Sequence, residues 1–176
     1  MTRDLTATSA SLISANQSDA SAIAALRVAV ADRLTANHGK GPWSLAGTIR
    51  SVHRALLYGD LLVLRRDNAV VATLILTRRK PWAIDTQYFA PARRPLYLTS
   101  MAVDPAWQQQ GVGRACLAEV DRLAASASAD TLRLDAFDAP AGAGPFYEKC
   151  GYREVKRVSY QQMPLIYYER SITPHS

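Results

Sequence analysis

The sequence lacks the features that would place it outside ordinary globular proteins. Its longest predominantly apolar run, residues 70–76, is far shorter than the ~18 residues of a membrane-spanning helix. Nine glycines and nine prolines in 176 residues are too few for a collagen-like or low-complexity chain. The chain begins without the compact apolar core of a secretory signal, so we expect a cytoplasmic location and no membrane partner. We expect one domain over residues 1–176, with residues 173–176 as a frayed tail.

Cysteine is equally scarce. Only Cys116 and Cys150 are present, and neither belongs to a CxxC pair or to a Cys/His cluster. Because a structural zinc site needs about four ligands, we expect no metal site. Both cysteines are interpreted as buried free thiols.

Positive charge exceeds negative charge, giving a formal net charge of +6 at pH 7. The arginines occur in scattered pairs, such as Arg65-Arg66 and Arg78-Arg79, with no extended basic tract. A basic balance favours anionic partners but does not separate nucleic acid from a phosphorylated cofactor or from plain solubility. We therefore interpret the pairs as solvated strand ends and loops, and do not expect nucleic acid as a partner.

Hydrophobic periodicity predicts an α/β domain, with a mixed sheet and helices on its faces, in the order β-α-α-β-β-β-α-β-α-β-β. The predicted helices are 19–34, 44–58, 112–123 and 146–150. The predicted strands are 5–14, 61–66, 70–78, 96–103, 132–137, 152–160 and 165–172. The strands flanking Asp67-Asn68 read as an antiparallel hairpin.

Capping residues and stop signals place the first two helices. Ser18 or Asp19 is expected to cap the first helix, and Ser44 the second, because a side-chain oxygen can accept the free amides of the first turn. Gly59 is a plausible stop for the second helix. The apolar stripe of the first helix is Ile23, Leu26, Val30 and Leu34. The buried face expected for the second is Leu45, Ile49, Val52 and Leu56.

A strand, a glycine-containing turn and a helix form the most informative segment. Strand 96–103 is followed by Asp104-Pro105 and then by Gln108-x-x-Gly111-x-Gly113-Arg114. The start of a helix carries amides without intrahelical partners and a partial positive charge, and glycine lets an anion approach the backbone. The segment therefore predicts a pyrophosphate-binding turn. It is neither a Walker P-loop, which needs Gly-Lys-Ser/Thr, nor a dinucleotide GxGxxG, whose third glycine is missing.

Two motifs in the same order resemble the GNAT acyltransferase superfamily. The segment from Val103-Asp104-Pro105 to Arg114 is similar to motif A of that family, written Q/R-x-x-G-x-G/A. Downstream, residues 143–152 (AGPFYEKCGY) resemble the family segment A-x-x-x-Y-E-K-x-G-F/Y. The resemblance extends from about residue 61 to the C-terminus and implies a GNAT-like acyl-CoA N-acyltransferase fold.

The resemblance implies acetyl-CoA as the co-substrate, bound where the strands ending near Val103 and Phe137 separate. The backbone of Met101 and Val103 would pair with the pantetheine amides, as an added strand does. The pyrophosphate would lie on the amides of the turn. The cofactor-binding residues implied in this way are Met101, Ala102, Val103, Gln108, Gln109, Gly111, Val112, Gly113, Arg114 and Tyr147.

The implied reaction is direct attack of a primary amine on the thioester. Tyr147 matches the family position that protonates the departing thiolate, and a backbone amide at a bulge in strand 96–103 would hold the oxyanion. The pKa of an amine, roughly 10, makes a base or a water chain necessary near neutral pH. Asp135 is the nearest acidic candidate and Asp138 another, and a water-mediated route stays open.

One departure from the family concerns Pro140, which stands where the family often has an asparagine that contacts the cofactor. The loop 139–145 is also poor in side chains that could replace this contact. This departure leaves open a non-catalytic acyl-CoA-binding module. A second alternative, an acetyltransferase acting on an RNA-linked amine such as aminoacyl-tRNA, is suggested by the net charge.

The acceptor site implied by the resemblance lies across the sheet from the cofactor. An aromatic pocket there would hold an apolar or cationic small molecule, or a peptide amine. The candidate lining residues are Trp43, Trp82, Tyr88, Tyr97 and His38. The sequence identifies neither the acceptor nor the acyl chain length; homodimers are frequent in the family, so a homodimer is an expectation by analogy.

Overall fold

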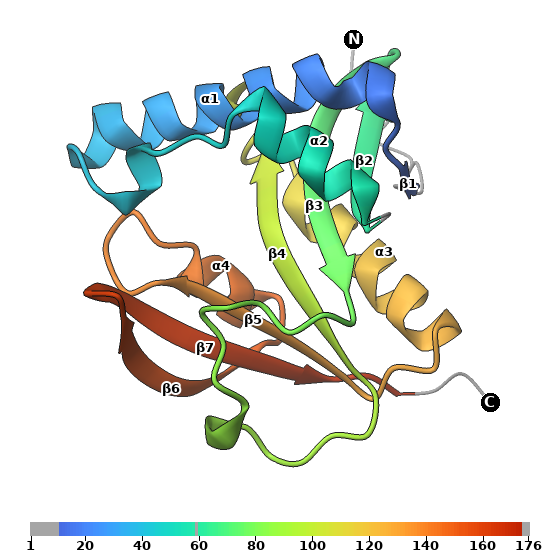
Figure 1. Ribbon diagram of the computed structural model, residues 1–176, viewed down its shortest axis with the longest axis vertical. Coiled ribbons are helices and arrows are strands. Elements are labelled where there is room, and N and C mark those ends of the chain that lie inside the picture. The colour runs from blue at the N-terminus through green and yellow to red at the C-terminus, as the bar shows by residue number, and fades with distance from the viewer. Residues whose placement is uncertain (1–10, 59, 174–176) are drawn as a thin grey trace, which may run out of the picture.

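Seven strands form one mixed sheet that carries helices on both faces (Figure 1). The computed structural model describes residues 11–58 and 60–173, and within them no helix is both long and apolar enough to span a bilayer. The strands are β1 (Leu12–Ser14), β2 (Leu61–Arg66), β3 (Ala69–Thr77), β4 (Pro95–Val103), β5 (Thr131–Phe137), β6 (Arg153–Tyr160) and β7 (Met163–Ser171). The helices are α1 (Ala20–His38), α2 (Ile49–Leu57), α3 (Val112–Ser126) and α4 (Gly144–Lys149).

The order across the sheet is β1-β2-β3-β4-β5-β7-β6. Only β4 and β5 are parallel among these neighbouring pairs. The predicted element order is therefore confirmed within the described residues. The β2–β3 hairpin turns through Asp67 and Asn68, whose φ angles of +47° and +65° are those of a tight two-residue turn. The predicted strand 5–14 is described only from residue 11, and Gly59 and residues 174–176 lie outside the described residues.

Two apolar clusters lie on opposite faces of the sheet. On one face α1 and α2 pack against β2, where Ile23 and Val52 meet Val63 in a buried cluster. On the other face α3 and α4 cover the central strands, and Cys116 and Val120 are fully buried in the main core. Both cysteines are buried free thiols, as predicted. Burying each large apolar side chain contributes about 1.5–3 kcal/mol, so the two clusters hold the helices on the sheet.

The second helix starts later than its predicted cap. Thr48, not Ser44, is the N-cap of α2, and its hydroxyl accepts from the Ser51 N–H at 3.2 Å. Residues Pro42–Ser44 form a separate 3-10 turn, and the chain leaves it extended. Leu45 is consequently 84% exposed and Ile49 46% exposed, so the predicted buried face is wrong at both positions. Val52 keeps its predicted place in the core.

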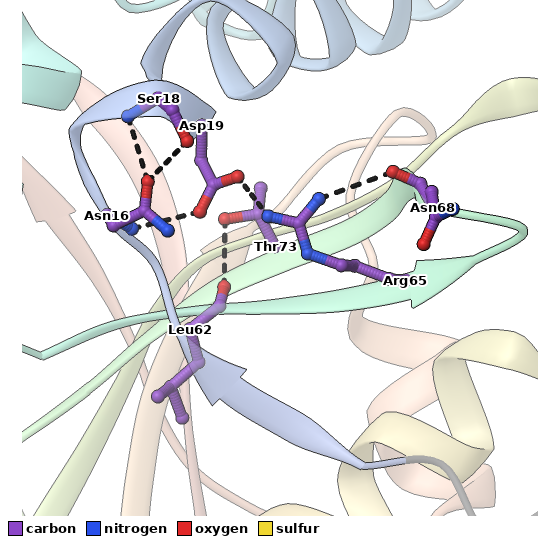
Figure 2. A network of polar contacts seen from close by, with 7 residues as sticks. All are labelled: Asn16, Ser18, Asp19, Leu62, Arg65, Asn68 and Thr73. Atoms are coloured by element: carbon purple, nitrogen blue, oxygen red, sulfur yellow. Dashed lines mark hydrogen bonds and ion pairs between the residues drawn. The ribbon is translucent and has the colours of Figure 1, made fainter.

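Asp19 is the N-cap of α1, as predicted for Ser18 or Asp19, but its side chain makes no capping hydrogen bond to the helix; Asn16 caps the 3-10 turn Gln17–Asp19 that leads into α1. The Asn16 side chain accepts from the Ser18 N–H at 2.9 Å, and the Asp19 carboxylate accepts from the Asn16 N–H at 2.9 Å. Asp19 is 3% exposed and forms an ion pair with Arg65 of β2. Figure 2 shows how this network joins the start of α1 to the β2–β3 hairpin, where Arg65 also reaches the Asn68 carbonyl.

Strands β4 and β5 separate after only three residue pairs, from Pro95–Thr131 to Tyr97–Arg133. The pairing ends at Tyr97, and the ribbons of β4 and β5 diverge in Figure 1. In the same region β4 contains a bulge: its pairing with β3 shifts register between Thr73 and Ile75, and Ser100 adopts φ +53°. A bulge bends its strand and increases the local twist. The predicted separation of these strands is therefore present, and it leaves the outer half of β4 without a strand on its β5 side.

We predict that Asp19→Ala lowers the free energy of unfolding by about 2 kcal/mol, because Arg65 and the Asn16 amide lose a charged acceptor. Urea unfolding followed by circular dichroism measures the change. Asp32→Ala, on the exposed side of α1, is the matched control and should stay within about 0.5 kcal/mol of the parent protein. Equal losses in the two variants would contradict a stabilising role for the network.

Candidate active site

The gap between β4 and β5 opens into a cavity of about 570 Å³ that reaches the start of α3. Nine of the ten predicted cofactor-binding residues line it, namely Met101, Ala102, Val103, Gln108, Gln109, Gly111, Gly113, Arg114 and Tyr147. The side chain of the tenth, Val112, is buried in the core, and only its backbone belongs to the turn. The structure thus brings together residues from β4, the turn and α4. The remaining walls come from α1 and from the loop before α4.

The start of α3 offers unpartnered backbone amides. Gly111 is the N-cap, in the left-handed conformation at φ +80°, and no side chain of the described residues caps the helix there. The first intrahelical bond runs from the Ala115 N–H to the Gly111 carbonyl at 2.9 Å. The amides of Val112, Gly113 and Arg114 precede that bond and have no partner within the helix. Together with the helix dipole, they form a site suited to an anion.

Gly113 keeps this helix start close to α4. A Cβ atom at position 113 would lie 3.0 Å from Cζ of Phe146 and 3.8 Å from Cε of Met101. A side chain here would therefore push α4 away or project toward the amides. The turn is also tied to β4, because Gln108 Nε2 donates to the Val103 carbonyl at 3.0 Å.

At Val103 the backbone N–H of β4 faces the gap between β4 and β5. The Asp104 N–H donates to the Val71 carbonyl of β3 at 2.9 Å. Because successive residues of a strand direct their backbone groups to opposite edges, the Val103 N–H points to the edge that β5 has left. An extended ligand could pair with this edge as an added strand does.

A second cavity, of about 590 Å³, lies on the α1–α2 side and meets the first at Tyr147. The two cavities share Met101, Ala102, Ala141, Ala143 and Tyr147, together with Val30 and Leu34 of α1. They therefore form one continuous cleft with two lobes. The small side chains of Ala141 and Ala143 line both lobes, so the loop that carries Pro140 shapes the cleft without the asparagine contact that the family often has at this position.

Tyr147 occupies the junction of the two lobes. It is 7% exposed, and its ring packs against Phe146, Tyr152 and Tyr168 at centroid distances of 5.3, 5.6 and 6.3 Å. Its hydroxyl lies 3.9 Å from Sδ of Met101. Burial raises the pKa of the Tyr147 phenol, and the nearby Asp135 carboxylate raises it further. The hydroxyl therefore keeps its proton near neutral pH and can donate it.

Asp135 projects into the second lobe, and Asp138 does not. Asp135 is half-buried, and burial raises the pKa of its carboxyl above the ordinary value. A raised pKa brings the carboxyl closer to the range in which it exchanges protons near neutral pH. Asp138 instead forms an ion pair with Arg157 at 3.0 Å and lies outside the cleft.

Only one of the predicted acceptor-site aromatics lines the cleft. Trp43 lies on the second lobe, edge-on to Phe137 at 6.0 Å between ring centroids. Tyr97 is 3% exposed in a buried cluster under the loop between β3 and β4, which corrects its predicted place in the acceptor site. Trp82 and Tyr88 belong to that same loop and line a separate surface pocket. His38, at the end of α1, is exposed outside the cleft.

Arg27, which lines the second lobe from α1, was not predicted from the sequence. It lies four residues after Ile23 and three before Val30, so it belongs to the helix face that carries the apolar stripe. The sequence did contain a signal for this position, because Arg27 is a charged residue on an otherwise apolar helix face.

Among residues 11–58 and 60–173, no group of three or more His, Cys, Asp or Glu side chains is placed to hold an ion.

Residues 58–154, more than half of the chain, match the family model of the acetyltransferase (GNAT) domain. The chain therefore belongs to the GNAT acetyltransferase family, which confirms the resemblance carried by the two motifs. A segment of 69 residues, 39% of the chain, is 38% identical to aminoglycoside N(6')-acetyltransferase type 1 of Stenotrophomonas maltophilia. That segment spans 45% of the curated relative, so less than half of its length is matched.

Solved structures share the fold over almost the whole chain. The ribosomal-protein-S18-alanine N-acetyltransferase of Escherichia coli superposes with a TM-score of 0.68, covering 94% of this chain and 96% of that one at 17% identity. A GNAT-family acetyltransferase of Listeria monocytogenes gives a TM-score of 0.71 over 92% of this chain and 94% of that one, at 15% identity. The predicted GNAT-like fold with a mixed sheet is thus confirmed.

We predict that Gly113→Val weakens acetyl-CoA binding at least about tenfold, which corresponds to about 1.4 kcal/mol. The new side chain meets Phe146 and covers the amides at the start of α3. Isothermal titration calorimetry measures the affinity, and Ala118→Val, at an exposed position of the same helix, is the control. Unchanged affinity in a folded Gly113→Val protein would place the pyrophosphate elsewhere.

Proposed function

We propose that this protein is an N-acetyltransferase that transfers the acetyl group of acetyl-CoA to a primary amine by direct attack. The observation that supports the proposal most strongly is the continuous cleft, whose two lobes meet at Tyr147. One lobe is built for a long anionic cofactor and the other is open to an acceptor. Membership of the GNAT acetyltransferase family supports the acetyl-transfer part of the proposal.

The first lobe fits coenzyme A on three independent features. The uncapped amides at the start of α3 suit the pyrophosphate, and the open edge of β4 at Val103 suits the pantetheine amides. Gly111 and Gly113 leave the approach free of side chains. When bound there, acetyl-CoA would supply the thioester that carries the acetyl group.

The residues at the junction have separate roles in the proposed reaction. The amine nitrogen forms a bond to the acetyl carbon, the carbon–sulfur bond breaks, the amine loses one proton and the sulfur gains one. Backbone amides at the β4 bulge, at Met101 or Val103, stabilise the negative charge on the carbonyl oxygen. Tyr147 holds the proton needed by the sulfur, and Asp135 accepts the proton of the amine directly or through water.

The test of the proposal is release of free thiol from acetyl-CoA with a panel of amines that includes amino acids, polyamines, aminoglycosides and peptides. Thiol release that depends on an amine would support it. Binding of acetyl-CoA with no thiol release from any amine would instead indicate a non-catalytic acyl-CoA-binding module. A requirement for aminoacyl-tRNA would indicate an RNA-linked acceptor, with binding that weakens steeply as salt rises.

A cytoplasmic location and a homodimer stay predictions from the sequence.

We predict that Tyr147→Phe lowers the turnover number at least about tenfold with little change in acetyl-CoA affinity, because it removes only the proton donor. Steady-state thiol release and calorimetry measure the two quantities. Tyr152→Phe is the matched control, since it also removes a buried hydroxyl from the same aromatic cluster but does not line the cleft. Equal turnover in both variants would exclude Tyr147 as the donor.

The role of Asp135 predicts a specific pH dependence. As base it must be ionised, so kcat/KM should fall as the pH drops through its pKa, which burial has raised above the ordinary value of 3.8. In Asp135→Asn this acidic limb should disappear, while the limb set by the amine itself remains. A variant that keeps the full pH profile of the parent would favour the water-mediated route without Asp135.

A further inference from the structure

The second lobe contains a half-buried cation with unused hydrogen-bond donors. Arg27 projects from α1 beside the loop that carries Gly47, where a Cβ at Gly47 would lie 3.7 Å from its Nη1. Its Nε and Nη2 are covered from solvent, and no partner for them exists among the described residues. Burial lowers the pKa of the Arg27 guanidinium, but arginine stays charged at neutral pH. The lobe thus keeps a cation that the folded chain leaves partly unpaired.

Charged donors that are covered from water and unpaired are unfavourable. The loss of solvent is not compensated unless a counterion or hydrogen bonds replace it. A neutral side chain of similar length would avoid this cost, so Arg27 is not explained by stability. The cost is relieved once an anion binds in the lobe.

The pair of nitrogens left free on Arg27 identifies the kind of anion. Nε and Nη2 lie on the same side of the guanidinium and match the two oxygens of a carboxylate. The same chain uses this pair twice for that purpose. Arg122 holds Glu119 through Nε at 2.8 Å and Nη2 at 2.7 Å. Arg157 holds Glu154 in the same way at 2.9 and 3.1 Å.

Asp135 gives the lobe its other charge. It lines the same cavity as Arg27 and lies at the Tyr147 junction, where the reacting amine must be placed. A carboxylate ligand is therefore attracted toward Arg27 and repelled from Asp135, whereas an ammonium group is attracted toward Asp135. A ligand that carries both groups satisfies both charges of the lobe and is oriented with its amine at the junction.

We propose that the acceptor is a small amino carboxylate, an amino-acid-like molecule whose carboxylate is bound by Arg27 while its amine faces Asp135 and Tyr147. The inference rests on the proposed acetyl transfer and specifies its substrate class. Because Nε and Nη2 are covered in the free protein, the Arg27 side chain turns into the cavity that it lines when the carboxylate enters. A polycationic acceptor, of the aminoglycoside kind named for the Stenotrophomonas relative, would instead place positive charge beside Arg27.

The test compares matched acceptors in the thiol-release assay. Amino acids and ω-amino carboxylates of increasing chain length are each paired with the neutral carboxamide, and aminoalkyl phosphates form a third arm. We expect kcat/KM to favour carboxylates over their amides at least about tenfold in the parent protein, because the amide leaves Arg27 unpaired. In Arg27→Gln this ratio should fall to about one, and Arg33→Gln, at an exposed position of α1, should keep it.

The outcomes separate the inference from the proposed function. No thiol release from any amine would overturn the acetyl transfer itself. Release with equal rates for carboxylates and amides would overturn only the role of Arg27, and a preference for phosphates would overturn the choice of carboxylate. Thermal unfolding of Arg27→Met without ligand is an independent readout. We expect an unfolding temperature equal to or above that of the parent, whereas a clear decrease would show Arg27 to be a structural residue.

Discussion

The early separation of β4 from β5 is the constraint on which the rest of the site depends. Parallel neighbours normally exchange hydrogen bonds along their full length, and here the exchange ends at Tyr97. The bulge at Ser100 bends β4 at the point where the pairing with β3 also shifts. Backbone groups that would otherwise remain unpaired in the interior face a cleft instead. Without this separation, α3 would begin against a closed sheet, and the two lobes could not meet at Tyr147.

The cofactor lobe could be predicted from sequence because local segments build it. The turn from Gln108 to Arg114 joins a strand directly to a helix, so its amides, its glycines and the strand edge follow from neighbouring residues. The hairpin at Asp67-Asn68 and the order of the elements were predictable for the same reason. Local patterns failed where two local alternatives competed, as at Ser44 and Thr48, both of which can cap a helix. Proline and glycine on either side of Leu45 kept the intervening residues out of the helix.

The acceptor lobe was much less predictable, because tertiary contacts assemble it from distant parts of the chain. Trp43, Asp135 and Tyr147 come from three separate segments, and no spacing in the sequence relates them. Aromatic character alone misled the assignment of Tyr97, which lies on β4 where that strand is still paired with β5. There the loop between β3 and β4 covers the sheet, and Tyr97 packs with Ile84 in the buried cluster beneath that loop.

The position of Arg27 shows how the stability of α1 and the selectivity of the cleft oppose each other. An apolar residue at position 27 would continue the stripe begun by Ile23 and would lower the cost of burying that helix face. It would also leave Asp135 as the only charged residue that lines the second lobe within the described part of the chain, and such a lobe would favour cations. With Arg27 present, the lobe carries one charge of each sign at different walls. A ligand with a single charge then pairs with either Arg27 or Asp135 and leaves the other without a partner. Selectivity follows from the cost of the unpaired group as well as from the contact that is made.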